Sequence, residues 1–398
     1  MKKLVLSLSV LLFTILLGSC NLSASKKTVS DPVELTVTEL PEVWEVNESQ
    51  RSNETKIQVA ILLDVSGSMD GLIEQAKSRL WNIVNTLTTL KYKGETPRIE
   101  IALYSYGMSS RLADNNYMRQ ITPLTTNLDL ISQKLFELRT SGSEEYCGTV
   151  ISRATKELEW GTNDADIKLI YIAGNEIFEQ GPISYRTAIP NALEKKIYVN
   201  TIHCGNMETG IRDLWRDAAE RGRGKFFNID SNARVVYIET PYDDEISRCN
   251  ERLNSTYISY GRRGSEYQDN QIAQDRNASS ISKSNYAERA VSKSSKMYDN
   301  SNWDLVDMTK NNKDALSKVA KEDLPKDLQG KTTAELEKLI AEKEQERNSI
   351  QKEIAELAKK RQAYIDEKSK EGNNNSDLGI AINKSILAFA TEKGYTAE

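Results

Sequence analysis

The sequence predicts an α/β fold with a doubly wound, mostly parallel sheet flanked by helices, followed by a C-terminal helical extension. The segment Ile57–Leu63 is apolar and largely β-branched apart from Gln58, which is typical of a strand buried on both faces. Directly after it, apolar residues recur at helical spacing from Leu72 to Leu90. This alternation of strand and helix continues to about residue 230 and then stops.

The expected elements follow from apolar runs and helical periodicity between breaks in the pattern. The predicted strands are Ile57–Leu63, Ile99–Ser105, Met118–Leu124, Ile167–Ala173, Ile197–His203 and Lys225–Ile229. The predicted helices between them are Leu72–Leu90, Leu128–Leu138, Val150–Trp160, Tyr185–Lys196 and Ile211–Arg221. Together they define a domain at residues 56–230.

The remaining sequence is more polar. Residues 231–331 are rich in Ser, Asn, Gln and charge, and we expect a partly helical linker with helices near Asp243–Leu253 and Gln268–Tyr298. Residues 332–398 predict C-terminal helices: a long one over about 332–371, which begins with a capping-box pattern, and a short one at Leu378–Thr391.

The long helix allows two interpretations. Its apolar residues follow a three-four spacing that could form a coiled coil. Lys343, Arg347 and Arg361 interrupt that seam, which favours a solvated helix that leans on the core or on Ile380–Phe389.

The N-terminus reads as an export signal. Residues 1–19 carry Lys2 and Lys3 and then an apolar run from Leu4 to Leu17, which is shorter than the roughly 20 residues of a spanning helix. The ending Leu17-Gly18-Ser19-Cys20 resembles a bacterial lipobox, which implies acylation (palmitate) of Cys20 as the mature N-terminus. The alternative is a plain signal peptide with a chance cysteine.

If Cys20 is acylated, residues 20–55 form a polar, lipid-anchored tether, and the protein lies in the cell envelope, at the outer membrane facing the periplasm. The membrane is then a partner through the lipid alone. The formal net charge is -5 and no basic stripe is present, so no nucleic-acid partner is expected.

The chemically informative segment lies at the carboxyl end of the first strand. It reads Asp64-Val65-Ser66-Gly67-Ser68-Met69. Open α/β sheets bind ligands in the crevice outside these strand ends. Asp64, Ser66 and Ser68 alternate along an extended turn, so their oxygens can converge on a hard cation such as Mg²⁺. The alternative is that Asp64 and Ser68 merely cap the following helix.

At this point the sequence resembles the von Willebrand factor A-type (vWA) domain, a Rossmann-like fold with a metal-ion-dependent adhesion site (MIDAS). The resemblance covers roughly residues 56–230 and rests on Ile61-Leu62-Leu63-Asp64-Val65-Ser66-Gly67-Ser68-Met69 and the order of elements after it. It implies that Ser66 and Ser68 ligate the metal directly and that Asp64 acts through water. It further implies a threonine from a loop before a later helix and an aspartate after the fourth strand.

Two parts of this site depart from the family pattern. In the loop Thr140–Gly148, Ser143 could supply the hydroxyl, and Glu144 or Glu145 a carboxylate. Asn175 stands where the second aspartate is expected, so one formal negative charge is lost unless a nearby glutamate compensates. The expected cofactor is Mg²⁺, with Mn²⁺ or Ca²⁺ as alternatives, held by a variant of the family site.

The function implied is a metal-dependent protein-binding or scaffolding module, whose cation completes its coordination with a carboxylate of an envelope protein partner. The alternative is a structural envelope protein with a vestigial pocket, which assembles through its C-terminal helices. An enzyme is disfavoured: His203 is the only histidine, and no nucleophile and base stand out as a pair.

Three cysteines remain after Cys20. The expected fold places Cys147, after the site loop, and Cys204, at the end of a strand, on the same rim, whereas Cys249 lies on a predicted helix. In an oxidising compartment we therefore expect a Cys147–Cys204 disulfide, the alternative being two separate buried thiols.

Overall fold

The central sheet of the computed structural model, which describes residues 54–108, 114–369 and 377–397, has six strands in the order β4-β3-β1-β5-β6-β7. Every neighbouring pair is parallel except β3 and β4. The strands are β1 Lys56–Asp64, β3 Arg98–Tyr106, β4 Arg119–Thr125, β5 Ile167–Gly174, β6 Tyr198–Cys204 and β7 Arg223–Ile229. The predicted doubly wound, mostly parallel sheet is therefore confirmed. The predicted signal peptide, Cys20 and most of the tether lie outside the described residues.

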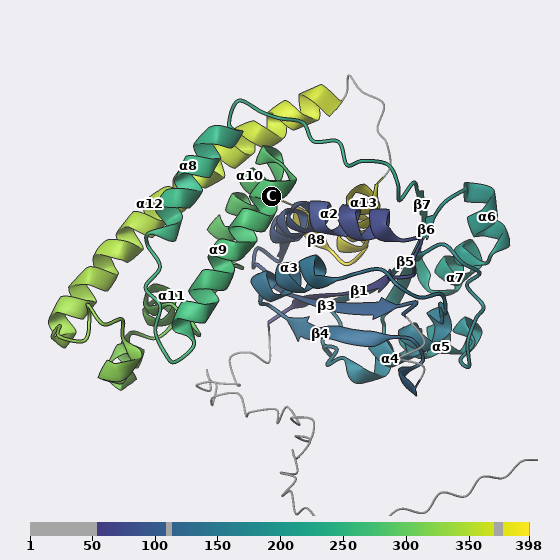
Figure 1. Cartoon of the computed structure of the whole chain (residues 1–398), viewed down its shortest axis with the longest axis horizontal. Helices are drawn as coiled ribbons and strands as arrows, with labels where there is room; N and C mark the ends of the chain where they lie inside the picture. The colour runs from purple at the N-terminus through teal and green to yellow at the C-terminus, as the bar shows by residue number, and fades with distance from the viewer. Residues whose placement is uncertain (1–53, 109–113, 370–376, 398) are drawn as a thin grey trace, which may run out of the picture. The chain divides into compact units, whose positions relative to one another are not determined.

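Helices cover both faces of this sheet (Figure 1). The helices of the α/β region are α2 Asp70–Thr88, α3 Leu128–Glu137, α4 Cys147–Glu157, α5 Tyr185–Glu194, α6 Met207–Arg212 and α7 Trp215–Arg221. On one face, α2 and α3 bury residues such as Trp81 and Ile131. On the other face, α4, α5 and α7 bury Val150, Ala188 and Trp215. Because both faces are covered, β1 and β5 are buried along almost their whole length, as their continuous apolar runs predict.

The last helix of the chain completes one of these faces. Helix α13, Leu378–Glu392, follows β7 only after the helical region, yet its Ile382 and Phe389 belong to the same apolar cluster as α2. The Ser385 hydroxyl donates to the Asn200 side-chain oxygen of β6 at 2.8 Å. Strand β8, Tyr395–Ala397, then pairs antiparallel with β2, Leu90–Tyr92, just after α2. The C-terminal residues are thus part of the α/β domain itself.

Between β7 and α13 the chain is more helical than the expected polar, partly helical linker. This helical region contains α8 Asp243–Asn254, α9 Gly264–Ile281, α10 Lys283–Ser294, α11 Leu305–Asn311, two 3-10 helices at Lys313–Lys318 and Lys321–Asp323, and α12 Thr333–Ser369. The predicted helix Gln268–Tyr298 is two helices, because Ser282 is extended and caps α10 through the Asn285 amide. None of the helices in the described residues has the length and apolar composition needed to span a bilayer.

Helix α12 begins with the predicted capping box: the Glu335 carboxylate accepts from the Thr332 amide, and the Glu335 amide donates to the Thr332 hydroxyl. Its seam packs against α8, α10 and α11 rather than against α13. Arg347 and Arg361, which interrupt the apolar spacing, are buried in this interface. The buried arginines therefore belong to the contact face and do not mark a solvated side.

Buried ion pairs join the helical region to the α/β domain. Arg289 of α10 is fully buried and contacts Asp129 of α3 at 2.6 Å and Asp275 of α9 at 2.8 Å. Its guanidinium also lies 4.4 Å from the ring centroid of Trp81 on α2. Lys293 contacts Asp275 at 2.9 Å, and burial lowers the pKa of this lysine to about 8. These charges compensate one another, which explains how a polar sequence forms a packed interface.

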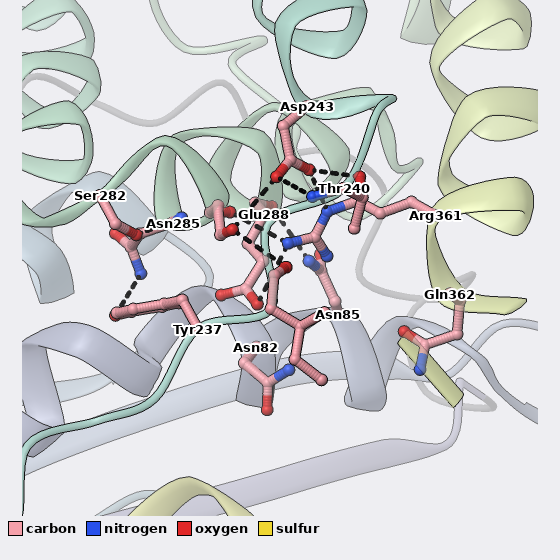
Figure 2. A network of polar contacts seen from close by, with 12 residues as sticks. Asn82, Asn85, Tyr237, Thr240, Asp243, Ser282, Asn285, Glu288, Arg361 and Gln362 are labelled. Atoms are coloured by element: carbon pink, nitrogen blue, oxygen red, sulfur yellow. Dashed lines mark hydrogen bonds and ion pairs between the residues drawn. The ribbon is translucent and has the colours of Figure 1, made fainter. Parts of the chain in front are cut away.

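A second polar network surrounds Arg361 and is drawn in Figure 2. The Arg361 side chain points from α12 toward Asp243 of α8 and Glu288 of α10, at 2.8 and 3.8 Å. Asp243 also accepts the Thr240 amide at 3.0 Å. Nearer the N-terminus of α12, Arg347 makes a similar contact: its guanidinium lies 2.6 Å from the Asp304 carboxylate. Both arginines hold α12 through charge-assisted hydrogen bonds.

We predict that α13 is required for the stability of the α/β domain. Ile386→Ala in the full chain should destabilise it by about 2–5 kcal/mol, because Ile386 is fully buried and the substitution leaves a cavity. Leu387→Ala is the matched control, since Leu387 is 40% exposed on the same helix and should change stability little. Urea unfolding followed by circular dichroism measures both. Equal effects of the two substitutions would show that α13 is not part of the core.

We also predict that the Arg289 ion pairs hold the helical region in place. Arg289→Met should destabilise the chain by about 3–5 kcal/mol, because it leaves Asp129 and Asp275 buried without their cation. Arg263→Met removes an exposed pair with Glu266 and should have little effect. Urea unfolding compares the two, and an Arg289→Met chain as stable as the control would contradict the role assigned to this network.

Candidate functional site

The candidate site lies where three parallel strands end side by side. Asp64 at the end of β1 pairs in register with Tyr106 of β3, and the neighbouring Leu63 pairs with Ala173 of β5. Asp64 is fully buried, Ser66 is nearly so, and Ser68 is exposed. The motif therefore runs from the base of the crevice to its rim.

The motif forms a turn that brings the side-chain oxygens of Asp64, Ser66 and Ser68 close together. The Asp64 carboxylate accepts the Ser66 amide at 2.7 Å, and the Ser66 and Ser68 hydroxyl oxygens lie 3.4 Å apart. Helix α2 starts at Asp70 with no side-chain cap hydrogen bond. Helix capping by Asp64 or Ser68 therefore does not explain these residues.

Asn175, just after β5, belongs to the same group. Its side-chain nitrogen donates to the Ser68 hydroxyl at 3.3 Å. Its side-chain oxygen is buried and has no hydrogen-bond partner among the described residues. The structure thus brings Asn175 next to the motif.

The loop before α4 crosses over the motif and supplies a carboxylate. The Ser141 amide donates to the Val65 carbonyl at 2.7 Å, and the Gly67 amide donates to the Gly142 carbonyl at 3.2 Å. Gly142 has a φ of +117°, and a Cβ there would lie 2.3 Å from the Met108 carbonyl carbon. Only glycine suits this crossing.

Of the three loop residues considered from the sequence, Glu145 is the one that reaches the site. It is buried and interacts with both Asp64 and Ser66. Glu144 instead lies against the Tyr146 phenol. Ser143 is exposed, and among the described residues no hydrogen bond joins its hydroxyl to Ser66 or Ser68.

Two buried carboxyl groups therefore face each other. Burial raises the pKa of Glu145 well above its usual range, and the nearby Asp64 charge raises it further. Burial also raises the pKa of Asp64, although its contacts with Glu145 and Ser66 oppose that rise. Glu176, exposed beside Asn175, adds a smaller unfavourable charge to both. A cation bound between Asp64 and Glu145 would stabilise their ionised carboxylates and so offset the unfavourable free energy of burying two negative charges.

Two supporting residues were missed in the sequence because their role depends on strand neighbours. Gly107 follows β3, and a Cβ there would lie 2.5 Å from a carboxylate oxygen of Asp64. Tyr106 lies beneath Asp64 and donates its hydroxyl to the Ala173 carbonyl at 2.9 Å. The only signal in the sequence was a glycine two residues after the predicted strand Ile99–Ser105. In the structure Gly107 has a φ of +76°, which favours glycine.

The oxygens at this site fit a hard cation. Asp64, Glu145 and Asn175 each have one buried side-chain oxygen without a hydrogen-bond partner in the described part of the chain. With the hydroxyls of Ser66 and Ser68 they form an all-oxygen donor set. No cluster of three or more His, Cys, Asp or Glu side chains suited to a metal occurs in the described residues, so a cation here would depend on hydroxyl and amide oxygens too.

The predicted Cys147–Cys204 disulfide is not formed. Cys147, Cys204 and Cys249 are all free and buried. Cys147 packs in the apolar cluster on the α4 face of the sheet, whereas Cys204 packs in the cluster on the α2 face. Both thiols lie near the same rim, but the sheet separates them.

One comparison with known proteins identifies a family. The sequence model of the von Willebrand factor type A domain matches residues 58–239. No curated protein matches the chain.

Several solved structures resemble part of the chain. An aerotolerance-related membrane protein from Bacteroides fragilis NCTC 9343, with multiple mutations to serines, is 15% identical, with a TM-score of 0.31 over 44% of this chain and 93% of that one. The conserved hypothetical protein BatB from Bacteroides thetaiotaomicron is 16% identical, with a TM-score of 0.34 over 44% and 90%. The SpRpn10 VWA domain is 18% identical, with a TM-score of 0.31 over 43% and 87%.

The family match covers β1 from Gln58 onward and the other five strands of the central sheet, and it includes the candidate site. This chain therefore carries a von Willebrand factor type A domain at residues 58–239.

Proposed function

We propose that this chain is a metal-dependent protein-binding module of a bacterial cell envelope. Its vWA domain belongs to a family whose members commonly mediate protein interactions. The observation that carries the proposal is the set of three buried oxygens without partners, on Asp64, Glu145 and Asn175. Unsatisfied buried oxygens are costly, and a cation would satisfy all three at once.

In this proposal Asp64, Ser66, Ser68, Glu145 and Asn175 hold a Mg²⁺-type cation. When bound, the cation supplies a positive charge that attracts a carboxylate of the partner protein. Glu145 compensates for the aspartate that Asn175 replaces, so the site again has two carboxyl groups. Ser68 is exposed at the rim, where a partner can approach it.

The alternative function is a structural envelope protein with an inert pocket, which assembles through its C-terminal helices. The raised pKa of Glu145 favours this alternative, because a protonated Glu145 can share its proton with Asp64 without any cation. Metal binding by the full chain separates the two hypotheses.

The proposal includes no catalysis. The His203 ring is buried, and its Nδ1 is paired with the Asn228 side-chain oxygen at 2.9 Å. Burial raises the pKa of the Cys147 and Cys204 thiols, which makes them poor nucleophiles.

We also propose that acylated Cys20 anchors the module in the envelope through the tether, at the outer membrane facing the periplasm. This part rests on the lipobox-like ending of the N-terminal apolar run.

We predict that Mg²⁺ stabilises the full chain through Glu145. Saturating Mg²⁺, at about 100 times its Kd, should stabilise the wild type by about 2.7 kcal/mol. Glu145→Gln should raise the melting temperature without metal, because it removes an ionisable group buried against Asp64, and should reduce the Mg²⁺-induced rise. Ser143→Ala is the control and should respond to Mg²⁺ like the wild type, since Ser143 is exposed.

Thermal unfolding and titration calorimetry measure these effects. Asp64→Ala combined with Ser68→Ala should leave the domain folded, remove the heat of Mg²⁺ binding and abolish partner capture. Absence of any heat with Mg²⁺ or Mn²⁺ in the wild type would show that the metal hypothesis is wrong.

A separate prediction concerns the anchor. Cys20→Ala should move the protein from the membrane fraction to a soluble one or leave it unprocessed, because the acylated residue is lost. Fractionation and mass spectrometry of the N-terminus measure this, with Cys249→Ala as a control that should stay in the membrane fraction. Normal maturation and unchanged membrane association of Cys20→Ala would rule out the anchor.

A further inference from the structure

The outer edge of β7 is an open side of the central sheet. β7 is the last strand in the sheet order, and no strand of the described residues pairs with its outer edge. Half of the main-chain groups of an edge strand point away from its neighbour, so they are available to another extended chain. This edge lies two strands away from the candidate metal site on β1 and β5.

A hollow of about 470 Å³ follows this edge. Its walls come from α7, β7 and α13. Phe226 packs toward the apolar cluster on the α7 face and Phe227 toward the cluster on the α13 face, and both are only half-buried. An added strand would find an apolar surface on each side of the sheet.

The charges around the hollow are mostly positive. Arg216, Lys225 and Lys384 line it, and the one acidic residue there, Glu220, accepts from Arg216 at 3.0 Å. Lys225 and Lys384 are exposed and have no ion-pair partner among the residues that the structure describes. The whole chain has a net charge of -5, so this positive edge is a local exception.

Lysines on an edge strand can also serve only to prevent aggregation. That role accounts for Lys225, which lies on β7 itself. It does not account for Lys384, which α13 contributes from the other wall of the same hollow. The arrangement is that of a groove with cations on both walls.

We propose that this groove binds a short, acidic, extended segment of a partner protein, which adds a strand to β7. Main-chain hydrogen bonds to β7 supply affinity, and acidic side chains pair with Lys225 and Lys384. The register between β6 and β7 is regular only from Phe226 to Ile229, because a bulge precedes it. The bound segment is therefore short. This surface acts independently of the metal site.

The proposal is tested with the full chain and a labelled synthetic peptide in which glutamate alternates with valine and threonine. Fluorescence anisotropy should show salt-sensitive binding, and a matched peptide with lysine in place of glutamate should not bind. Lys225→Glu combined with Lys384→Glu should weaken binding by about tenfold, since it replaces two attractions with repulsions. Lys359→Glu combined with Lys360→Glu, an equal charge change on α12, should leave binding unchanged.

Strand addition is tested by methylating alternate amide nitrogens of the peptide, in both registers, which leaves the protein untouched. One register should lose binding because the methyl groups block main-chain hydrogen bonds. Undiminished binding of both methylated peptides, or no binding of the parent peptide, would overturn the proposal. So would binding of the edge to anionic phosphatidylglycerol vesicles in preference to the peptide. The Asp64→Ala, Ser68→Ala chain should bind the peptide normally, which separates this surface from the metal site.

Discussion

A parallel sheet must be covered on both faces, and this constraint governs how the whole chain is arranged. The strands β1 and β5 have almost no exposed residue, so every helix that packs on them is needed. On one face the helices that connect the strands are sufficient. On the other face α2 and α3 cover only part of the sheet, and α13 covers β5, β6 and β7. The helical region is therefore an insertion between the last strand and the last helix of one domain.

The sheet and the motif could be predicted from the sequence because both depend on local patterns. A continuous apolar segment such as Ile57–Leu63 is typical of a strand that is buried on both faces, between two layers of helices. Asp64, Ser66 and Ser68 lie within five residues of one another, and the turn that joins them brings their oxygens together. The order of the remaining strands follows from the alternation of strand and helix.

What could not be predicted depends on contacts between distant segments. The sequence offered Ser143 for a hydroxyl and did not distinguish Glu144 from Glu145 for a carboxylate. The loop that carries them is joined to the motif by two main-chain hydrogen bonds, from the Ser141 amide and to the Gly142 carbonyl, which no local pattern predicts. Cys147, at the start of α4, and Cys204, at the end of β6, both lie near one rim, but their side chains pack in clusters on opposite faces of the sheet. The polar composition after residue 230 predicted a linker, because arginine and lysine are usually exposed. In the structure Arg289 and Lys293 are buried against the Asp275 carboxylate, a contact that the sequence pattern does not show.

The position of α13 also has a consequence for the order in which the chain folds during synthesis. The last strand of the sheet ends at Ile229, whereas α13 begins at Leu378. At a ribosomal rate of about 5–20 residues per second, the roughly 150 residues between them take about 8–30 seconds to make. Throughout that interval Tyr171 and Ile202, which belong to the cluster that α13 joins, lack their final cover. A nascent chain of this topology therefore carries an exposed apolar sheet face until its last helix is made, and during that time it depends on chaperones or on delayed folding to avoid aggregation.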